Sequence, residues 1–424
     1  MRVELSGEQG GVCDAAVAWG RWVGGPRGKR GATGPQAARV RAIRGPAGTG
    51  KTVTAAEVAR RLASYGTNVA VVAPTGKAAH VLRGKGIAAT TIHAFQYVLV
   101  EDGSGATGPG VATGGGAGGL RFVLRAEATG DPDVVICDEA SMATAEHLAD
   151  LLSRVPRVLL VGDPGQLPPV QGTGVLADAT GWDLTEVHRQ ALDSGVIRFA
   201  HAIRAGESIA SALRAGAPDV VAGRPPHLPG VLLVARNDTR VRLNLGVRTQ
   251  FHAQREDGVG LDPGPGAERR SAGALPSWPI EGDRVVCLSN HRGASGTRGV
   301  AGAETPWCNG TVGDVTRRLS CGNSSPHLDS IHGFTALCDD GTTRDGTAWL
   351  RQLSSPTLLA VDAADARRRD ARFAWGWCLT THKAQGSEWD EVAVMGDGFG
   401  TPAEIQAWRY TAATRAAKKL WWAT

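Results

Sequence analysis

The chain has few lysines although it is basic overall. Lysine accounts for only seven of its 46 basic residues, the rest being arginine, and the formal net charge is +5. A genome whose base composition favours arginine codons explains most of this bias. Lysines that persist under it mark places where a compact ammonium cannot be replaced by a planar guanidinium. The net charge permits nucleic acid as a partner but does not require it.

The sequence also lacks the patterns of several protein classes. Its seven cysteines are scattered and never form a Cys-x-x-Cys pair, which argues against a zinc site or a disulfide framework and favours a reducing cytoplasm. No apolar run approaches the length of a membrane span, and no apolar h-region marks a secretory signal. With 424 residues, 42% of them hydrophobic, we expect a globular protein of two to four domains.

Short apolar runs that alternate with a helical pattern predict a parallel sheet in the first half of the chain. Residues 52–65 carry apolar side chains at helical spacing, and Gly66 ends the pattern. The alternation predicts a doubly wound α/β domain whose ligand lies at the carboxyl ends of the strands. Four runs have the length and composition of buried parallel strands: residues 40–44, 68–73, 134–137 and 157–161.

Residues 45–52 (GPAGTGKT) match the phosphate-binding pattern G-x-x-x-x-G-K-[ST], between a predicted strand and a predicted helix. Backbone N–H groups of such a loop surround phosphate oxygens, Lys51 reaches the β- and γ-phosphates, and the Thr52 hydroxyl holds Mg²⁺. The sequence therefore predicts a nucleoside triphosphate site. The residues expected to hold the phosphates are Gly45, Pro46, Ala47, Gly48, Thr49, Gly50, Lys51 and Thr52.

Two further motifs follow predicted strands. Asp138 and Glu139 form an acidic pair that gives one carboxylate to Mg²⁺ and one to the attacking water. Residues 162–170 contain Gln166, which can contact the γ-phosphate. Alone, the acidic pair is typical of a solvated helix start and residues 162–170 of a Pro-Gly turn. The phosphate loop upstream favours the catalytic interpretation.

The remaining segments predict two insertions. Residues 97–100 and 120–124 are strand-like and flank a glycine-rich stretch, which predicts a β-hairpin with a long tip; a disordered insertion is the alternative. Residues 256–280 are typical of a linker. Short strands after Glu281, with Asn-Gly and Asp-Gly turns, predict a small antiparallel barrel. The α/β pattern resumes at strands predicted over 375–379 and 391–395.

As a set, these motifs resemble the superfamily 1B DNA helicases of the RecD and Dda group. The matching segments are residues 5–9 (the adenine-reading motif, weakly), 73–79 (Ia), 91–95 (Ib), 184–190 (IV), 379–388 (V) and 410–416 (VI). The resemblance implies two RecA-like doubly wound motor domains. Domain 1A is expected at 1–180 with a hairpin, 1B, at about 97–125. Domain 2A is expected at 181–280 and 351–424, and an SH3-like domain, 2B, at 281–350.

The resemblance also implies roles for individual residues. Gln9 would read the adenine, Gly386 and Glu388 would contact the nucleotide, and Arg189 and Arg415 would be arginine fingers on the γ-phosphate. For each hydroxyl or histidine of the DNA motifs taken singly, the alternative is a turn or cap residue. The residues implied to line the single-stranded DNA track are Pro74, Thr75, Lys77, Thr91, His93, Thr381, His382 and Lys383.

The function implied is an ATP- and Mg²⁺-dependent helicase that moves 5′ to 3′ on single-stranded DNA and unwinds forked duplex DNA. We expect a functional monomer in the cytoplasm of a bacterial cell, encoded by the host or a phage, with replication or recombination proteins as possible partners and no membrane contact. Alternatives are a translocase that displaces proteins with little unwinding and an RNA-directed helicase. A non-catalytic scaffold is disfavoured because Lys51, Asp138, Glu139 and Arg415 are all present.

Overall fold

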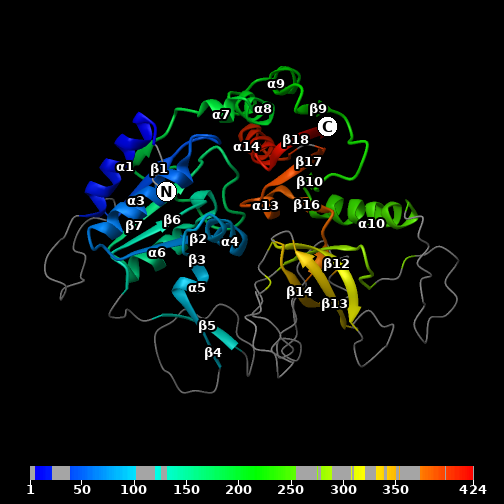
Figure 1. Cartoon of the computed structure of the whole chain (residues 1–424), viewed down its shortest axis with the longest axis horizontal. Helices are drawn as coiled ribbons and strands as arrows, with labels where there is room; N and C mark the ends of the chain where they lie inside the picture. The colour runs from blue at the N-terminus through cyan, green and yellow to red at the C-terminus, as the bar shows by residue number, and fades with distance from the viewer. Residues whose placement is uncertain are drawn as a thin grey trace. The chain divides into compact units, whose positions relative to one another are not determined.

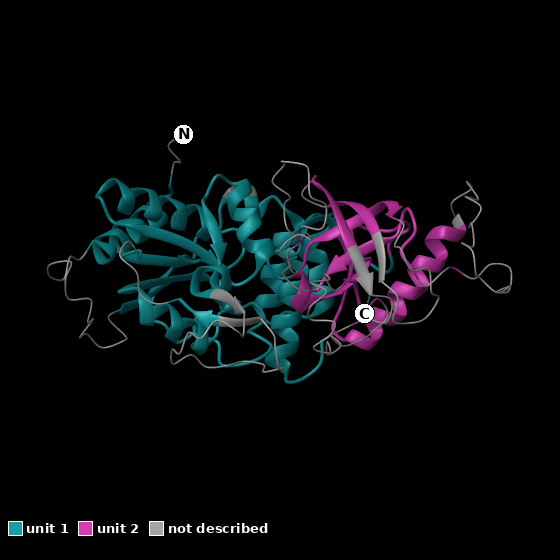
Figure 2. Ribbon diagram, turned by 90° about the horizontal axis from the view of Figure 1, so that it is seen from below, with its two compact units in different colours: residues 1–224, 385–391, 397–424 teal, residues 225–384, 392–396 magenta. Residues whose placement is uncertain are grey.

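The computed structural model describes most of the chain, in two compact units (Figure 2). Unit 1 comprises residues 1–224, 385–391 and 397–424, and unit 2 comprises residues 225–384 and 392–396. The described residues are 5–21, 39–101, 120–125, 131–254, 275, 278–288, 307, 310–319, 331–338, 341–349, 353, 373–396 and 398–423.

A six-stranded, all-parallel sheet forms the centre of unit 1. Its strand order is β3 (Ala89–Thr91), β2 (Val69–Ala73), β6 (Val134–Cys137), β7 (Arg157–Gly162), β1 (Val40–Arg44) and β8 (Gly181–Asp183). The four predicted strands are confirmed, as is the α/β class. The two edge strands, β3 and β8, have three residues each, too few for a sequence pattern to predict them.

Helices cover both faces of this sheet because its strands alternate side chains between two apolar clusters. Leu159 and Val161 of β7 join the cluster under α1 (Gly7–Gly20) and α3 (Lys51–Ser64). Val158 and Leu160 of the same strand join the cluster under α6 (Ala145–Arg154). A sheet that is apolar on both faces is typical of parallel α/β folds.

The predicted β-hairpin is confirmed. Strands β4 (Tyr97–Glu101) and β5 (Leu120–Leu124) pair antiparallel, with Tyr97 opposite Leu124 and Glu101 opposite Leu120. The hairpin follows α5 (Ile92–Gln96) and projects beyond it, away from the six-stranded sheet (Figure 1). Its glycine-rich tip, residues 102–119, lies outside the described residues.

The rest of unit 1 is mainly helical. The helical pattern predicted around residues 196–203 is confirmed as α8 (Gly195–Arg204). Gln406 of α14 (Pro402–Ala413) donates from Nε2 to the carbonyl oxygens of Ile203 and Arg204 at the C-terminus of α8. The other elements are α4 (Gly76–Gly84), the 3₁₀ turn η1 (Ala140–Met142), α7 (Arg189–Leu192), α9 (Ile209–Gly216), β9 (Val220–Ala222) and β18 (Ala416–Ala423), which is parallel to β9.

Unit 2 contains parallel and antiparallel strands. In its parallel part, β10 (Val231–Val234) pairs on one side with β16 (Cys378–Thr380) and on the other with residues 392–394 of β17 (Trp389–Met395). Helix α10 (Asn237–Gln254) follows β10, and α13 (Thr381–Ala384) follows β16. The antiparallel sheet has the order β14 (Thr343–Trp349), β13 (Ile331–Cys338), β12 (Val312–Leu319), β11 (Arg284–Cys287) and β15 (Phe373–Trp375).

The small antiparallel strands predicted after Glu281 are thus present, while an SH3-like fold for them stays a prediction. The single strand predicted over residues 375–379 is wrong, because β15 ends at Trp375 and β16 begins at Cys378. Gly376 separates them: its N–H donates to Arg284 O, and a Cβ there would lie 2.7 Å from the carbonyl carbon of Val285. The predicted linker, residues 256–280, falls mostly outside the described residues.

In the described part of the chain, no helix is both long and apolar enough to cross a bilayer.

A buried ion cluster joins α10 to the start of β11 in unit 2. Asp283, which is fully buried, accepts hydrogen bonds from Nε and Nη2 of Arg248 at 2.7 Å each. It also lies 2.9 Å from His252 Nε2 and accepts from the Ile280 N–H.

Asp283→Ala should lower the free energy of unfolding by about 3–5 kcal/mol, because it leaves the buried guanidinium of Arg248 without its carboxylate. Urea denaturation followed by tryptophan fluorescence measures this. The matched control is Asp390→Ala in the exposed Asp390–Lys418 pair, which should leave the free energy of unfolding close to that of the wild type. Equal effects of the two substitutions would contradict a stabilising role of the buried cluster.

Candidate nucleotide-binding site

The phosphate-binding loop runs from the end of β1 to the start of α3. Gly48 and Gly50 adopt the left-handed conformation, with φ of 86° and 72°, which glycine accepts without steric cost. Gly50 caps α3, and Lys51 is the first residue of that 14-residue helix. The loop therefore meets a helix N-terminus, where unpaired N–H groups and the helix dipole favour an anion.

Lys51 folds back over this loop. Its Nζ donates to the Pro46 carbonyl oxygen at 2.8 Å, and the Thr49 hydroxyl donates to the same oxygen at 2.9 Å. Burial lowers the pKa of Lys51, while the carboxylates of Asp163, Glu139 and Asp138 oppose that shift. The charges of three acidic groups that follow neighbouring strands therefore act on this ammonium.

Thr52 and Asp138, the two residues predicted to hold Mg²⁺, are in contact. The Thr52 hydroxyl donates to Asp138 Oδ2 at 3.1 Å, and the Glu139 N–H donates to Oδ1 at 3.0 Å. Burial, followed by the charge of Glu139, raises the pKa of Asp138 to about 6. Among the described residues, no group of three or more His, Cys, Asp or Glu could hold a metal. One hydroxyl and one carboxylate fit Mg²⁺, which keeps several waters and takes substrate phosphates as ligands.

Glu139 is the one residue other than glycine, in the part of the chain that the structure describes, with a positive φ (53°). This conformation is costly for a residue with a side chain and is concentrated at functional sites. Glu139 precedes the first residue of η1, where the chain turns after β6. The geometry is compatible with separate roles for the two carboxylates.

Gln9 lies against the loop. Its Nε2 donates to Thr49 O at 3.1 Å and lies 2.8 Å from Nε2 of His188. The backbone N–H of His188 donates to Gly48 O. The neighbouring Glu8 accepts hydrogen bonds from Thr185, and these lower the pKa of Glu8. The N-terminal helix therefore joins the segment before Arg189 to the phosphate-binding loop.

Gln166 and the two predicted arginine fingers have different surroundings in the structure. Gln166 is buried, and its Oε1 has no hydrogen-bond partner within the described ranges. Arg415 is buried and donates to the carbonyl oxygens of Thr411 and Ser387, so its hydrogen bonds go to segments near it rather than to the loop. Arg189 begins α7, but its side chain lies outside the described part. The finger roles stay predictions.

Residues implied to touch the nucleotide from motif V lie in unit 1. Gly386 has φ of 72°, and a Cβ there would lie 3.4 Å from Thr75 Oγ1, so the motif V turn packs on the start of α4. Glu388 is exposed. Gln385, between α13 and this turn, donates from Nε2 to Leu167 O at 2.9 Å, which links motif V to residues 162–170.

The predicted DNA residues of unit 1 gather at two helix starts. Thr75, after Pro74, caps α4 by accepting the Ala78 N–H, and Thr91 caps α5 by accepting the Ala94 N–H. The hydroxyls thus have the structural role that was the alternative for each, and contact with DNA stays a prediction. Lys77 Nζ lies 5.2 Å from the ring centroid of Trp389, and the exposed His93 lies beside the rings of Tyr97 and His147.

In unit 2, Thr381, His382 and Lys383 belong to α13. The Thr381 hydroxyl donates to Val234 O of β10 at 3.5 Å. Burial lowers the pKa of His382 and of Lys383. The three residues therefore stay together after β16, as the motif predicts, and their contact with DNA is untested.

Comparison with known proteins identifies two segments. Residues 32–219 match the family model described as an AAA domain, and residues 376–422 match the UvrD-like helicase C-terminal domain, so that the two cover more than half of the chain. The ATP-dependent RecD2 DNA helicase of Deinococcus radiodurans is 30% identical over 89% of this chain and 46% of its own length. The RecBCD enzyme subunit RecD of Mycolicibacterium smegmatis is 27% identical over 89% of this chain and 67% of its own.

The chain thus matches an AAA domain and a UvrD-like helicase C-terminal domain, and its sequence is similar to that of RecD helicases. It spans about half the length of its Deinococcus relative. Its fold is similar to that of Pif1 from Candida albicans, with a TM-score of 0.54 and 17% identity, over 100% of this chain and 95% of that one. Bacteroides Pif1 bound to single-stranded DNA gives a TM-score of 0.52 at 15% identity, over 99% and 92%.

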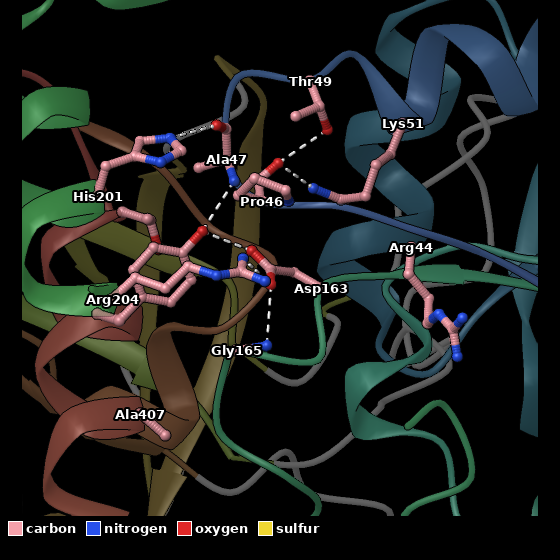
Figure 3. A network of polar contacts seen from close by, with 12 residues as sticks. Arg44, Pro46, Ala47, Thr49, Lys51, Asp163, Gly165, His201, Arg204 and Ala407 are labelled. Atoms are coloured by element: carbon pink, nitrogen blue, oxygen red, sulfur yellow. Dashed lines mark hydrogen bonds and ion pairs between the residues drawn. The ribbon is translucent and has the colours of Figure 1, made fainter. Parts of the chain in front are cut away.

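Several residues of this nucleotide-binding site were not singled out by sequence reasoning. The Tyr410 hydroxyl accepts the Ala47 N–H at 2.8 Å and donates to Asp163 Oδ2 at 2.5 Å, and His201 Nε2 lies 3.0 Å from Ala47 O (Figure 3). Arg204 pairs with Asp163 at 2.7 Å. Asp163 and Tyr410 lie within recognised motifs, but their contacts join segments that are far apart in the sequence.

Asp138→Asn should stabilise the protein at neutral pH. Because the pKa of Asp138 is raised to about 6, the folded protein holds this proton more tightly than the unfolded chain, and stability falls as the pH rises from about 4 to 6. An uncharged amide of the same shape avoids this cost. At pH 7.5, without nucleotide or Mg²⁺, the free energy of unfolding of the variant should exceed that of the wild type by about 2–3 kcal/mol.

Urea unfolding of both proteins between pH 4 and 7.5 measures the difference, which should shrink toward pH 4. Asp390→Asn serves as the exposed control and should show no such trend. A difference that stays the same at every pH would contradict the raised pKa of Asp138.

Proposed function

We propose that this chain is an ATP-dependent motor that moves 5′ to 3′ along single-stranded DNA and unwinds duplex DNA. The observation that carries the proposal is the convergence of Lys51, the Thr52–Asp138 pair and Glu139 at the carboxyl ends of β1 and β6. Lys51 and Mg²⁺ would neutralise the phosphates, and Glu139 would orient and deprotonate the attacking water.

Contacts within unit 1 support a motor rather than a simple hydrolase. The Leu167 N–H donates to the Thr411 hydroxyl of α14 at 2.9 Å, and Leu167 O accepts from Gln385. Residues that follow β7, next to the loop, are therefore bonded to motifs V and VI. A change at the γ-phosphate would be transmitted to the segments implied to hold DNA.

The relatives support the substrate. The Deinococcus relative is named an ATP-dependent DNA helicase, and one Pif1 structure is bound to single-stranded DNA. We propose that single-stranded and forked DNA are substrates here too, that the monomer is active, and that replication or recombination proteins are its partners. The direction of movement rests on the resemblance. A motor on bacterial DNA would act in the cytoplasm, whether host or phage encodes it.

DNA-stimulated ATP hydrolysis is the first test. With Mg²⁺, single-stranded DNA should raise the rate of phosphate release, and Glu139→Gln should reduce kcat by at least about 100-fold while leaving ATP binding intact, because it removes the general base. Phosphate release and binding of a fluorescent ATP analogue measure the two effects. Rapid turnover by the variant would remove Glu139 as the base, and no hydrolysis by the wild type would overturn the motor proposal. Stimulation by RNA in place of DNA would favour the RNA-directed alternative.

Tail polarity is the second test. A duplex with a 5′ single-stranded tail should be unwound, and the same duplex with a 3′ tail should not. Strand separation on a gel measures this, with Lys51→Ala as the inactive control. Preference for the 3′ tail would contradict the proposed direction. Displacement of streptavidin from an end label without opening of either duplex would favour the protein-displacing translocase.

A further inference from the structure

One peptide unit of the phosphate-binding loop is held from both sides. The bond between Pro46 and Ala47 is trans, since the one cis peptide in the described residues is Ala217–Pro218. In a trans peptide the carbonyl and the N–H point in opposite directions. The Pro46 carbonyl accepts from Lys51 Nζ at 2.8 Å, and the Ala47 N–H donates to the Tyr410 hydroxyl at 2.8 Å.

The Tyr410 hydroxyl is itself fixed. It donates to Oδ2 of Asp163 at 2.5 Å, and both side chains are buried, at 1% exposure each. Asp163 also accepts from Arg204 Nη1 at 2.7 Å and from the Gly165 N–H at 2.9 Å. Because the hydroxyl hydrogen is directed to Asp163, a lone pair of the Tyr410 oxygen is left to accept the Ala47 N–H.

Two more contacts hold this arrangement to the helices of unit 1. The guanidinium of Arg204, at the end of α8, lies 5.5 Å from the centroid of the Tyr410 ring. His201, one turn earlier on α8, places Nε2 at 3.0 Å from Ala47 O. Both polar groups of Ala47 are therefore bonded to helices other than the one that the loop begins.

The network borders the γ-phosphate side of the loop. A lysine at this position of a phosphate-binding loop reaches the β- and γ-phosphates, and its Nζ lies against Pro46. Asp163 is also the strongest of the three carboxylate charges that act on the Lys51 ammonium, ahead of Glu139 and Asp138. The residues that hold the peptide are thus linked to the Lys51 side chain, the group expected to reach the γ-phosphate that distinguishes a triphosphate from a diphosphate.

We propose that Tyr410, oriented by Asp163 and Arg204, is a positioning residue that fixes the Pro46–Ala47 peptide and through it the Lys51 ammonium. It deepens the proposed function, on which it rests, by assigning discrimination between ATP and ADP to α14. Tyr410 acts through the peptide and Lys51 and does not itself touch the phosphates. Loss of its hydroxyl leaves the peptide free to rotate and Lys51 without a fixed acceptor.

Tyr410→Phe removes one oxygen and keeps the ring. Isothermal titration with ATPγS and with ADP, both with Mg²⁺, gives the two dissociation constants. The Kd for ATPγS should rise about fivefold, the effect of losing one neutral hydrogen bond, while the Kd for ADP changes less than about twofold. Tyr65→Phe is the matched control, because Tyr65 is exposed beyond the end of α3. It should change neither constant.

A purely structural role would lower the melting temperature and shift both constants together. Equal shifts, no shift, or tighter binding of ATPγS by Tyr410→Phe would each overturn the inference. If that variant does not fold, Arg204→Lys provides the readout, because it keeps the positive charge but loosens the hold on the Asp163 carboxylate that orients the hydroxyl, and the same outcomes decide. A wild-type protein that binds neither nucleotide would instead contradict the proposed function, so the two failures are distinguishable.

Discussion

The parallel register of three central strands is the constraint on which the site depends. Arg44 of β1 lies opposite Gly162 of β7, and Cys137 of β6 lies opposite Leu160 of the same strand. The chain therefore leaves β1, β6 and β7 at one edge of the sheet. The phosphate-binding loop, Asp138 and Asp163 start from adjacent points, and the charges on Lys51 and the three carboxylates meet there because the strands are hydrogen-bonded in this register.

Local patterns were enough to predict this edge of the sheet. About 20 consecutive residues specify the buried strand, the glycine-rich turn and the helix that form the phosphate-binding loop. The strands before Asp138 and before residue 162 are specified just as locally. The break at Gly376 was not predictable in this way, because it depends on the approach of the β11 backbone. The three-residue strands β3 and β8 exist because neighbours pair with them, and their own sequence carries little signal.

The candidate site was predictable as far as each motif acts on its own strand. Lys51, Thr52 and Asp138 were identified correctly as neighbours, since strand order alone brings them together. The bonds of Tyr410 to Ala47 and Asp163 join residues separated by 363 and 247 positions, and no local pattern specifies them. For Thr75 and Thr91 the motif was predictable but the role was not. A hydroxyl that caps a helix has the same sequence signature as one that binds a phosphate.

The first three residues of the phosphate-binding loop have no free backbone N–H donor. The Gly45 N–H donates to Gly162 O at 3.3 Å, Pro46 has no amide hydrogen, and the Ala47 N–H is bonded to Tyr410. An anion that enters here must take its main-chain hydrogen bonds from Gly48 onward. The backbone of the first part of the loop is thus hydrogen-bonded to the sheet and to α14. The second part, at the start of α3, is the part whose N–H groups can bind an anion.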